Sequence, residues 1–386
     1  MRVKLKDIFD LQMGKTPSRS NLEYWNTTDY KWISIADLTK TSKYIFETKE
    51  YLSKSAIKDS GIKVIPANTV VMSFKLSIGK TAITKEDMYS NEAIMAFKDK
   101  HVINILPEYI FYLFKYKNWE EGSNKAVMGK TLNKATLSEI EVEICSIEKQ
   151  RQIVSILDKI MSSVDGRKQE LQLLDELIKA RFVEMFGDPV ANDKGWKMKP
   201  LLDMGKCKNG MNFHYDDSGV EISCLGVGDF KDLSVIDNTK KLSIVSLNEM
   251  PSEEYLLKDG DIVFVRSNGN KDLVGRSLAI YPGKLPTTFS GFCIRYRIHD
   301  DEITVPYLLR VLKMESMRKK MAGRGANIQN LNQQILGTLV IPVPPIELQN
   351  QFVDFVRAID KSKVAVQKAL DETQILFDSL MQKYFG

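Results

Sequence analysis

The sequence has few of the residues that build metal or disulfide sites. Its 386 residues include four cysteines and three histidines, and no two cysteines form a Cys-x-x-Cys pair. Because structural zinc sites need closely spaced cysteine or histidine ligands, we expect no metal in this chain. His101, His214 and His299 lie far apart in the sequence, so we interpret them as surface residues or as core residues with satisfied ring nitrogens.

Long apolar runs are absent as well. No stretch approaches the roughly 20 apolar residues of a membrane-spanning helix, and the charged opening Met-Arg-Val-Lys-Leu-Lys-Asp does not lead into a signal-peptide core. We therefore expect a cytoplasmic protein that does not contact a membrane. With 43% hydrophobic residues the chain can build cores, and its length favours two or three domains.

The sequence contains no complete nucleotide-binding motif. Gly-Lys-Thr begins at Gly14, Gly79 and Gly129, but none of the three is preceded by glycine at the position that a phosphate-binding loop requires. No glycine-rich strand-to-helix turn followed by an acidic residue indicates a bound methyl donor. We expect no catalytic residue and no cofactor in this chain. The alternative in another class is an enzyme with an unrecognised site, such as a nuclease or a methyltransferase fused to a recognition domain.

What the chain does contain is an internal repeat with a period of about half its length. Lys4-Leu5-Lys6-Asp7-Ile8-Phe9-Asp10 recurs as Lys197-Met198-Lys199-Pro200-Leu201-Leu202-Asp203, and Ile35-Ala36-Asp37-Leu38 recurs as Val227-Gly228-Asp229-Phe230. Both halves reach a Phe-Gly pair, at Phe186-Gly187 and Phe385-Gly386. A duplicated sequence predicts a duplicated structure.

Each half places a segment of short strands before one long helix. Val-, Ile- and Phe-rich runs bounded by Gly, Asn, Pro and Asp predict the strands. The predicted fold is α+β, with two pseudo-symmetric mixed α/β domains separated by two long helices. Its predicted segments are residues 1–145 (first domain), 146–187 (first long helix), 188–345 (linker and second domain) and 346–386 (second long helix).

The two long helices share a heptad pattern of apolar residues. Ser146 is a suitable N-cap for the first helix, and Pro344-Pro345 suits the first turn of the second. Polar seam positions in one copy, such as Arg167 and Lys363, correspond to apolar positions in the other, which favours pairing of the two helices with each other. We predict an antiparallel, intramolecular coiled coil; a coiled-coil dimerisation arm is the alternative. The predicted helix–helix seam consists of Ile153, Leu157, Ile160, Val164, Leu171, Leu174, Ile178, Phe352, Val356, Ile359, Val366, Leu370, Phe377 and Leu380.

A duplicated domain on a helical spacer suits the recognition of two half-sites on DNA. The net charge of +5 is only mildly basic, so charge alone does not establish DNA binding. Loops that combine glycine with Lys, Arg, Asn, Ser or Gln are the candidates for base contacts, because Arg suits guanine and Asn or Gln suits adenine; ordinary solvated turns are the alternative. The candidate DNA-binding residues are Lys15, Thr16, Ser18, Arg19, Lys75, Ser77, Lys80, Lys125, Lys130, Asn133, Asn209, Asn212, Arg266, Ser267, Asn268, Asn270, Lys271, Arg276, Arg324, Asn327, Gln329 and Asn330.

The sequence resembles the specificity subunit of Type I restriction-modification systems. The resemblance rests on the duplicated plan, on the Phe-Gly-Asp-Pro junction at Phe186–Pro189 followed by Gly195-Trp196, and on Ile-Pro-Val-Pro-Pro-Ile-Glu-Leu-Gln at Ile341–Gln349. It covers essentially the whole chain. The first helix lead-in, Glu143–Gln150, lacks the prolines but keeps Glu148 and Gln150 in register with Glu347 and Gln349.

The resemblance implies a non-catalytic subunit with two target recognition domains that bind a split, asymmetric sequence of double-stranded DNA. It also implies two methyltransferase (M) subunits and two restriction/translocase (R) subunits as partners. In that family the methylated base is adenine, and S-adenosylmethionine, ATP and Mg are bound by the partners. A coiled-coil scaffold or dimerisation protein without sequence-specific DNA binding is the alternative, and equal affinity for all duplexes at matched salt would indicate it.

Overall fold

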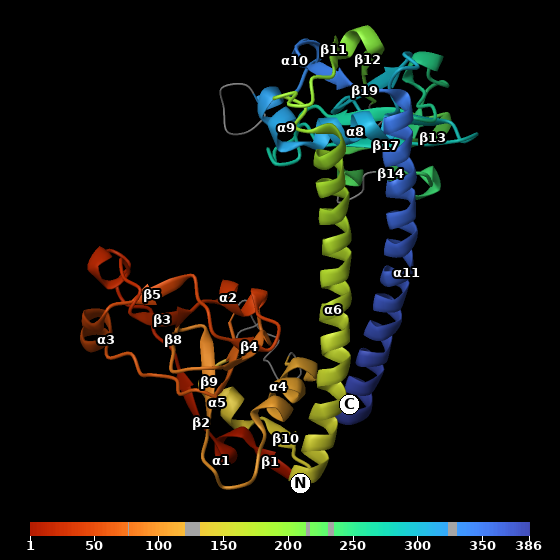
Figure 1. Cartoon of the computed structure of the whole chain (residues 1–386). Coiled ribbons are helices and arrows are strands. Elements are labelled where there is room, and N and C mark those ends of the chain that lie inside the picture. Colours follow the sequence, from red (N-terminus) through yellow and green to blue (C-terminus); the bar gives the residue numbers. More distant parts are fainter. Residues whose placement is uncertain (76, 120–131, 214–216, 231–234, 323–329) are drawn as a thin grey trace. The chain divides into compact units, whose positions relative to one another are not determined.

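The chain forms two compact units (Figure 1). The structure is a computed structural model that describes residues 1–386 except 76, 120–131, 214–216, 231–234 and 323–329. The first unit comprises Met1–Gln169 and Gln367–Gly386, and the second comprises Glu170–Val366. Helices α6 (Ile147–Phe186) and α11 (Ile346–Phe385) each contribute residues to both units.

The first domain contains ten strands and several short helices among its described residues. The strands are β1 (Arg2–Lys4), β2 (Phe9–Met13), β3 (Tyr30–Ile33), β4 (Tyr44–Ile45), β5 (Glu50–Leu52), β6 (Val70–Ser73), β7 (Thr81–Thr84), β8 (Tyr89–Ser90), β9 (Ile94–Asp99) and β10 (Glu141–Glu143). The helices are α1 (Leu5–Ile8), η1 (Leu22–Tyr24), α2 (Ile35–Lys40), α3 (Lys54–Ser60), α4 (Pro107–Tyr116) and α5 (Lys134–Glu139).

The second domain repeats the order of the ten strands, with some differences in the short helices between them. Its strands are β11 (Lys197–Pro200), β12 (Gly205–Asn209), β13 (Val220–Leu225), β14 (Val235–Ile236), β15 (Ser243–Leu247), β16 (Asp261–Val265), β17 (Ser277–Ile280), β18 (Thr287–Phe289), β19 (Cys293–Ile298) and β20 (Val340–Val343). Its helices are α7 (Leu201–Met204), η2 (Val227–Asp229), η3 (Thr239–Lys241), η4 (Glu253–Tyr255), α8 (Val305–Lys313), α9 (Glu315–Ala322) and α10 (Gln333–Gly337).

The sheets of the two domains have the same topology. A five-stranded sheet has the order β2-β9-β6-β7-β4 in the first domain and β12-β19-β16-β17-β14 in the second. A three-stranded sheet has the orders β5-β3-β8 and β15-β13-β18, and a two-stranded sheet pairs β1 with β10 and β11 with β20. Even the short parallel pairs, β4 with β7 and β14 with β17, recur. The predicted pseudo-symmetric α+β fold is therefore confirmed.

The repeat extends to single capping contacts. Asp37 accepts a hydrogen bond from the Ser34 backbone N–H (2.8 Å) at the start of α2, and Asp229 accepts one from the Gly226 N–H (2.9 Å) at the start of η2. Both aspartates belong to the motif that recurs in the sequence, Ile-Ala-Asp-Leu and Val-Gly-Asp-Phe. They satisfy backbone donors that would otherwise lack a partner at the first turn.

A buried glutamine joins each long helix to its domain. Gln150 and Gln349 are fully buried. The side-chain oxygen of Gln150 accepts from the backbone N–H of Leu106 (2.9 Å), and its amide donates to the carbonyls of Asn104 and Cys145. Gln349 makes the corresponding bonds to the N–H of Thr304 (2.8 Å) and to two carbonyls, those of Glu302 (2.8 Å) and Pro344 (2.9 Å). Gln150 and Gln349 therefore make equivalent hydrogen bonds, as their equivalent positions in the sequence repeat predicted.

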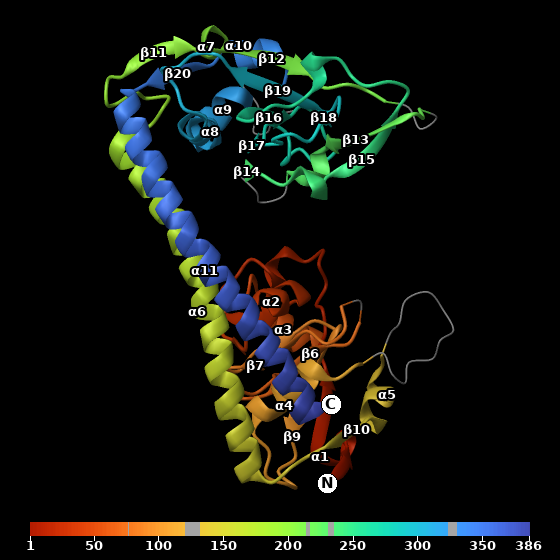
Figure 2. The ribbon, with the colours of Figure 1, turned by 90° about the vertical axis from the view of Figure 1, so that its right-hand side faces the viewer.

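Within each unit α6 and α11 pack against one another and run antiparallel (Figures 1 and 2). In the second unit the end of α6 meets the start of α11, with the rings of Phe182 and Phe352 5.4 Å apart. In the first unit the start of α6 meets the end of α11, where Leu157 and Phe377 share one apolar core. Every predicted seam residue is buried or half-buried, as an apolar heptad seam requires.

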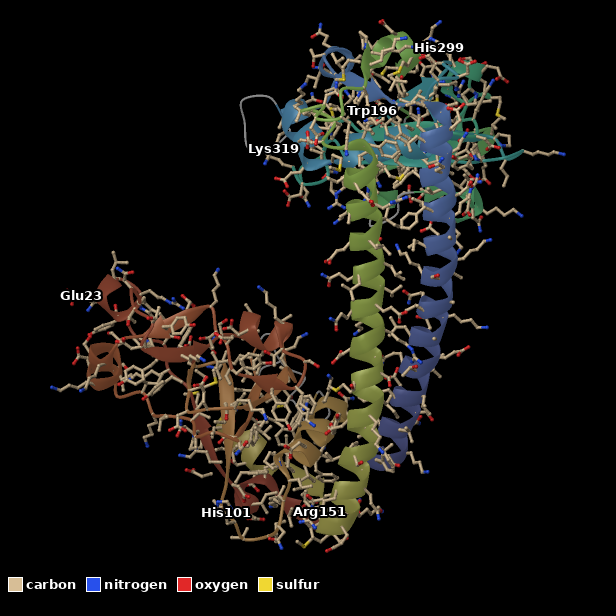
Figure 3. All side chains as sticks on the ribbon, in the orientation of Figure 1. Glu23, His101, Arg151, Trp196, His299 and Lys319 are labelled. Carbon is tan, nitrogen blue, oxygen red and sulfur yellow. The ribbon has the colours of Figure 1, made fainter. Side chains whose placement is uncertain are left out.

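The segment between α6 and β11 forms a compact turn. The Asp188 carboxylate accepts from the backbone N–H groups of Val190 (2.8 Å) and Ala191 (3.0 Å). The indole of Trp196, marked in Figure 3, donates to the carbonyl of Phe186 (3.0 Å). These bonds return the chain to the end of α6, so the Phe-Gly-Asp-Pro and Gly-Trp parts of the motif contact one another.

Candidate nucleic-acid interface

The loop after β2 carries four candidate residues, and most of their polar atoms already have partners. Arg19 forms an ion pair with Glu50, with one N–O distance of 3.1 Å, and its guanidinium lies 3.7 Å from the centre of the Trp25 ring. Lys15 donates to the Ser60 carbonyl, and the Ser18 hydroxyl lies 2.8 Å from that of Ser20. An arginine held this way is presented in one orientation, which suits a planar base edge.

Three candidate residues of the first domain surround Glu92. Thr16 donates a hydrogen bond to the Glu92 carboxylate, and Arg19 and Lys75 lie close enough to act on it electrostatically. The Thr16 hydrogen bond, with smaller contributions from the two cations, lowers the pKa of Glu92. Glu92 was not predicted from the sequence, because a single glutamate in a turn carries no recognisable pattern. Its exposed carboxylate is an acceptor of the kind that pairs with the cytosine amino group.

Lys75, Ser77 and Lys80 lie in the turn between β6 and β7. The Ser73 hydroxyl accepts from the Lys80 backbone N–H (3.0 Å), and the Gly79 N–H donates to the Ser73 carbonyl (2.9 Å). Gly79 has a φ of +89°, which favours glycine there. These two hydrogen bonds hold the backbone at Gly79 and Lys80 against Ser73, and the side chains of Ser77 and Lys80 are exposed.

The corresponding turn of the second domain, between β16 and β17, carries six candidate residues. Asn268 accepts from the Asn270 N–H (2.8 Å), and Asn270 accepts from the Asp272 N–H (3.0 Å), so two consecutive Asx turns shape it. Arg276 donates to the carbonyls of Asp272 (3.2 Å) and Phe230 (3.4 Å). The side chains of Asn268, Asn270 and Lys271 are exposed, whereas those of Arg266, Ser267 and Arg276 are half-buried.

An exposed aromatic residue lies beside this turn and was missed from the sequence. Phe292 is 60% exposed, and its carbonyl accepts from the backbone N–H of Arg266 (2.8 Å). An exposed ring at this place suits apolar contact with a thymine methyl group or stacking on a base. Of the nearby candidates, Asn209 accepts from the Gln333 amide (3.3 Å), and Asn212 is exposed.

Some candidates have a structural role or lie outside the described residues. Asn133 is the N-cap of α5 and accepts from the Thr136 N–H (2.9 Å). Asn332, which was not predicted, caps α10 in the same way through the Ile335 N–H (2.8 Å). Asn330 is described and exposed. Lys125, Lys130, Arg324, Asn327 and Gln329 lie outside the described residues, as does His214.

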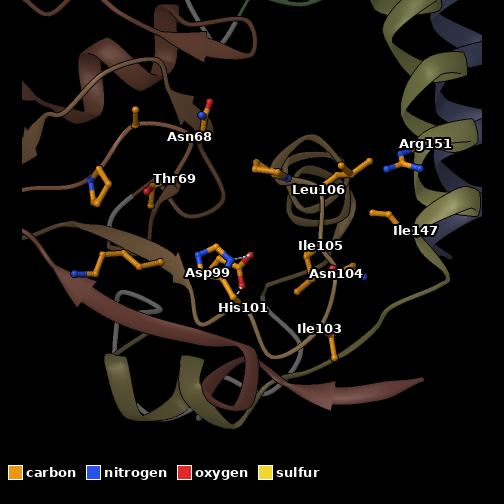
Figure 4. Close-up of a pocket in the computed structure, with 14 residues that line it drawn as sticks. Asn68, Thr69, Asp99, His101, Ile103, Asn104, Ile105, Leu106, Ile147 and Arg151 are labelled. Carbon is orange, nitrogen blue, oxygen red and sulfur yellow. Dashed lines mark hydrogen bonds and ion pairs between the residues drawn. The ribbon is translucent and has the colours of Figure 1, made fainter.

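One cavity of the first unit shows no catalytic arrangement among its lining residues. It has a volume of about 590 Å³ and is lined by residues 66–69, 98–99, 101, 103–107, 147 and 151 (Figure 4). His101 is 86% exposed and contacts Asp99, its Nδ1 lying 3.3 Å from the carboxylate. His299 is likewise exposed. These two histidines are surface residues, in agreement with the sequence interpretation.

Metal-ligating and nucleophilic groups are not gathered in the part of the chain that the structure describes. No group of three or more His, Cys, Asp or Glu side chains there is placed to hold a metal ion. Burial raises the pKa of Cys207 and of Cys224 to about 12, so both thiols stay protonated at neutral pH. None of the described helices is long and apolar enough to cross a membrane.

Comparison with known families decides what these paired domains are. The family model described as the Type I restriction modification DNA specificity domain matches the chain twice, over residues 1–176 and 193–373. The chain belongs to the Type I restriction-modification specificity family. It is a specificity subunit, and its two domains serve the recognition of DNA sequence. The two matches coincide with the two halves of the repeat.

Relatives match this specificity subunit along most of its length. The Type I restriction enzyme MjaIX specificity subunit of Methanocaldococcus jannaschii is 25% identical over 98% of this chain and 91% of its own length. The StySPI specificity subunit of Salmonella potsdam is 24% identical over 92% of this chain and 82% of its own.

Solved structures show the same fold. The S subunit of a Type I restriction-modification system from M. genitalium has a TM-score of 0.54 at 15% identity, covering 100% of this chain and 96% of its own. A chain from a structure that describes complex assembly and conformational transition of the type I R-M system has a TM-score of 0.61 at 16% identity, covering 100% and 97%.

Proposed function

We propose that this specificity subunit reads a bipartite, asymmetric DNA sequence, with one half-site read by each domain. The observation that supports this most directly is that identical topology carries different loops. The turn that joins β6 to β7 runs from Phe74 to Lys80, whereas the turn that joins β16 to β17 is longer and runs from Arg266 to Arg276. Different side chains on a common framework present different donors and acceptors to base edges. Two half-sites of different sequence follow.

We further propose that the pair α6 and α11 sets the gap between the half-sites. Each helix has 40 residues, and an α-helix rises about 1.5 Å per residue. Because the same two helices contribute to both units, their length limits how far apart the two domains can engage one duplex. A scaffold without sequence preference is not favoured, because it leaves the two DNA specificity domains without a purpose.

Catalysis in this proposal belongs to partner subunits. Two methyltransferase subunits would bind S-adenosylmethionine and methylate adenine, and two restriction/translocase subunits would use ATP and Mg for cleavage. The support is that the relatives are named specificity subunits of restriction enzymes, and that a neighbouring structure is described by complex assembly of such a system. The proposed role of this chain is to hold the duplex while a partner works on the neighbouring base.

Selection from random duplexes tests the proposal. The full chain, free and in complex with its methyltransferase subunits, is incubated with a library of random duplexes, and the bound fraction is sequenced. We expect two different short sequences separated by a gap of fixed length. Enrichment of a single continuous site, or binding of all duplexes with equal affinity at matched salt, would contradict the proposal.

A loop replacement assigns the half-sites. Substituting Arg266–Lys271 by a Gly-Ser sequence of equal length should alter the half-site read by the second domain and leave the other unchanged. A change in the other half-site would mean that the domains are assigned wrongly. Replacing the exposed turn Lys284-Leu285-Pro286 on the same domain is the matched control and should change neither half-site.

A further inference from the structure

Two lysines occupy matched positions near the ends of α4 and α8. The hydroxyls of Tyr109 and Tyr307 make matched hydrogen bonds to the carbonyls of Glu143 (3.2 Å) and Pro342 (2.9 Å), which aligns the two helices. In that alignment Lys115 of α4 corresponds to Lys313 of α8. Helix α8 packs between the five-stranded sheet and the long helices (Figures 1 and 2), and both lysines line hollows beside those helices.

The hollow of the second unit has a volume of about 360 Å³ and an excess of basic side chains. Arg310, Lys313 and Lys363 line it together with Asp175 and Asp360. The Lys363 ammonium lies 2.7 Å from the Asp175 carboxylate, so that pair is neutral. The Nε and Nη2 atoms of Arg310 are buried and have no hydrogen-bond partner among the described residues. Buried donors of a cation without an acceptor are costly, and an anion would satisfy them.

Further arginines stand close to Lys313. Arg318 of α9 donates to the carbonyls of Gly275 (3.1 Å) and Val274 (3.3 Å), which fixes it against the turn between β16 and β17. Burial, together with Arg310, Arg276 and Arg318, lowers the pKa of Lys313 to about 8. Arg276 belongs to the same turn as the candidate base-reading residues. The basic cluster is therefore continuous with the proposed reading loop.

The first unit has a similar hollow, in which the basic side chains are lysines. A hollow of about 370 Å³ is lined by Lys40, Lys115 and Lys168, with Asp165 as the acidic member. The Lys115 side chain is exposed, yet crowding of its ammonium by protein atoms lowers its pKa; Asp165 opposes this shift, and the nearby Lys168 and Lys80 add to it. Lys80 belongs to the turn between β6 and β7. Here too the basic cluster adjoins the proposed reading loop.

We propose that each of these two hollows binds the phosphodiester backbone of the DNA that the adjoining loop reads. The inference rests on the proposed function and adds to it phosphate contacts that do not depend on the base sequence of the DNA. Phosphate contacts position a protein on a duplex, while loops that differ between the domains read the bases. Like charges held close together in the free protein repel one another, and a polyanion relieves that repulsion. The two hollows occupy matched positions in the two domains, which suits a DNA backbone that has the same chemistry at both half-sites.

An acidic surface of a partner protein is the competing ligand. DNA is favoured because Arg276 and Lys80 belong at once to the basic clusters and to turns that carry candidate base contacts. A duplex that reaches those turns therefore lies beside the clusters.

The test compares two substituted lysines with two controls in the full chain. Lys115→Met and Lys313→Met remove the charges and keep the length of the side chains. Lys159→Met and Lys361→Met, at exposed positions of α6 and α11, are the matched controls. Affinity is measured by fluorescence anisotropy at several salt concentrations, for a duplex obtained by selection and for a scrambled duplex of equal composition.

We expect each of the two variants to bind both duplexes about 3- to 10-fold more weakly and to lower the slope of log K against log salt by about one phosphate contact. The controls should match the wild-type chain. Unchanged affinity in either variant, or loss on the selected duplex alone, would overturn the inference. Unchanged DNA binding with loss of a partner subunit would assign the cluster to an acidic protein surface, and would also overturn it. If the wild-type chain shows no sequence preference, the proposed function itself fails, which these variants would not cause.

Discussion

Each long helix is tied to its domain by one buried glutamine. Replacing Gln349 with Leu keeps the volume but leaves the Thr304 N–H and two carbonyls without their partners. Unsatisfied buried groups cost about 1–3 kcal/mol each. We expect Gln349→Leu, and Gln150→Leu in the first unit, to lower the free energy of unfolding by about 2–4 kcal/mol in urea titrations.

The sequence supplies matched controls for this prediction. Gln152 and Gln351 lie two residues further along the same helices and are exposed. Their replacement by Leu should change stability by no more than about 0.5 kcal/mol, as is usual for surface positions. Equal effects at Gln349 and Gln351 would show that the buried hydrogen bonds contribute little.

We expect Lys313 to make stability and DNA binding respond oppositely to pH. Its pKa is about 8 in the folded chain against an ordinary value of 10.5, so the unfolded chain binds more protons between these values. Stability from this group therefore rises as the pH increases from below 8 to above 10, and its charged form is a cost to folding at pH 7. We expect Lys313→Met to raise the melting temperature at pH 7 by a few degrees, because it removes a crowded charge.

The same titration should weaken DNA binding as the pH rises from 7 to 9, because the ammonium loses its proton. The Lys313→Met variant should lose this part of the pH dependence in anisotropy titrations at fixed salt. An identical pH profile in both chains would count against a phosphate contact at this site. The groups that face Lys313 are Arg310 of α8, Arg276 of the β16–β17 turn, Arg318 of α9, Asp175 of α6, and Asp360 and Lys363 of α11.

The side-chain contacts of single residues were the structural feature that the sequence predicted least well. Arg19 was predicted from its loop as a DNA contact, but its partner Glu50 lies 31 positions away and no local pattern announces the pair. Asn133 was predicted for the same reason, and its side chain caps α5 instead of remaining free. Composition locates loops, whereas the partner of each polar side chain depends on tertiary contacts.

The two long helices, whose apolar residues repeat over many turns, were predicted well from the sequence. The seam of α6 and α11 followed from apolar residues at alternating steps of three and four, and all predicted members are buried or half-buried. What the pattern did not give is which polar seam residues meet. Arg167 donates to the hydroxyl of Thr373, so two polar positions face each other across the antiparallel pair. Strands as short as β4 and β14 are beyond such patterns, because two residues show no periodicity.

The end of α6 depends on a cluster of aromatic rings. Phe182 is fully buried, and its ring lies 5.0 Å from Phe186, 5.8 Å from Tyr307 and 5.4 Å from Phe352. We expect Phe182→Ala to lower the free energy of unfolding of the second unit by about 3–5 kcal/mol, the usual cost of a large cavity. Fluorescence of Trp196, which bonds to the carbonyl of Phe186, reports unfolding at this place.

Val183 is the control for this cavity. It is the next residue of α6 and is 46% exposed. Val183→Ala should change stability by less than about 0.5 kcal/mol. A similarly small effect of Phe182→Ala would mean that α6 is held to the domain by contacts other than the ring cluster.

For the whole molecule, the internal repeat was the decisive sequence feature, since it alone predicted two like domains.

Whether the helix pair sets the gap between half-sites can be tested by shortening it. Deleting residues 165–171 of α6 and 369–375 of α11 removes one heptad from each helix and keeps the remaining seam in register. Seven residues span about 10 Å of helix, which is the length of about three base pairs. We expect selection from random duplexes to return the same two half-sites with a gap shorter by about two to three base pairs. The control deletes one heptad from α6 alone, which breaks the register and should weaken binding without defining a new gap. If the shortened chain kept the original gap, or changed a half-site sequence, the division of work between helices and domains would be wrong.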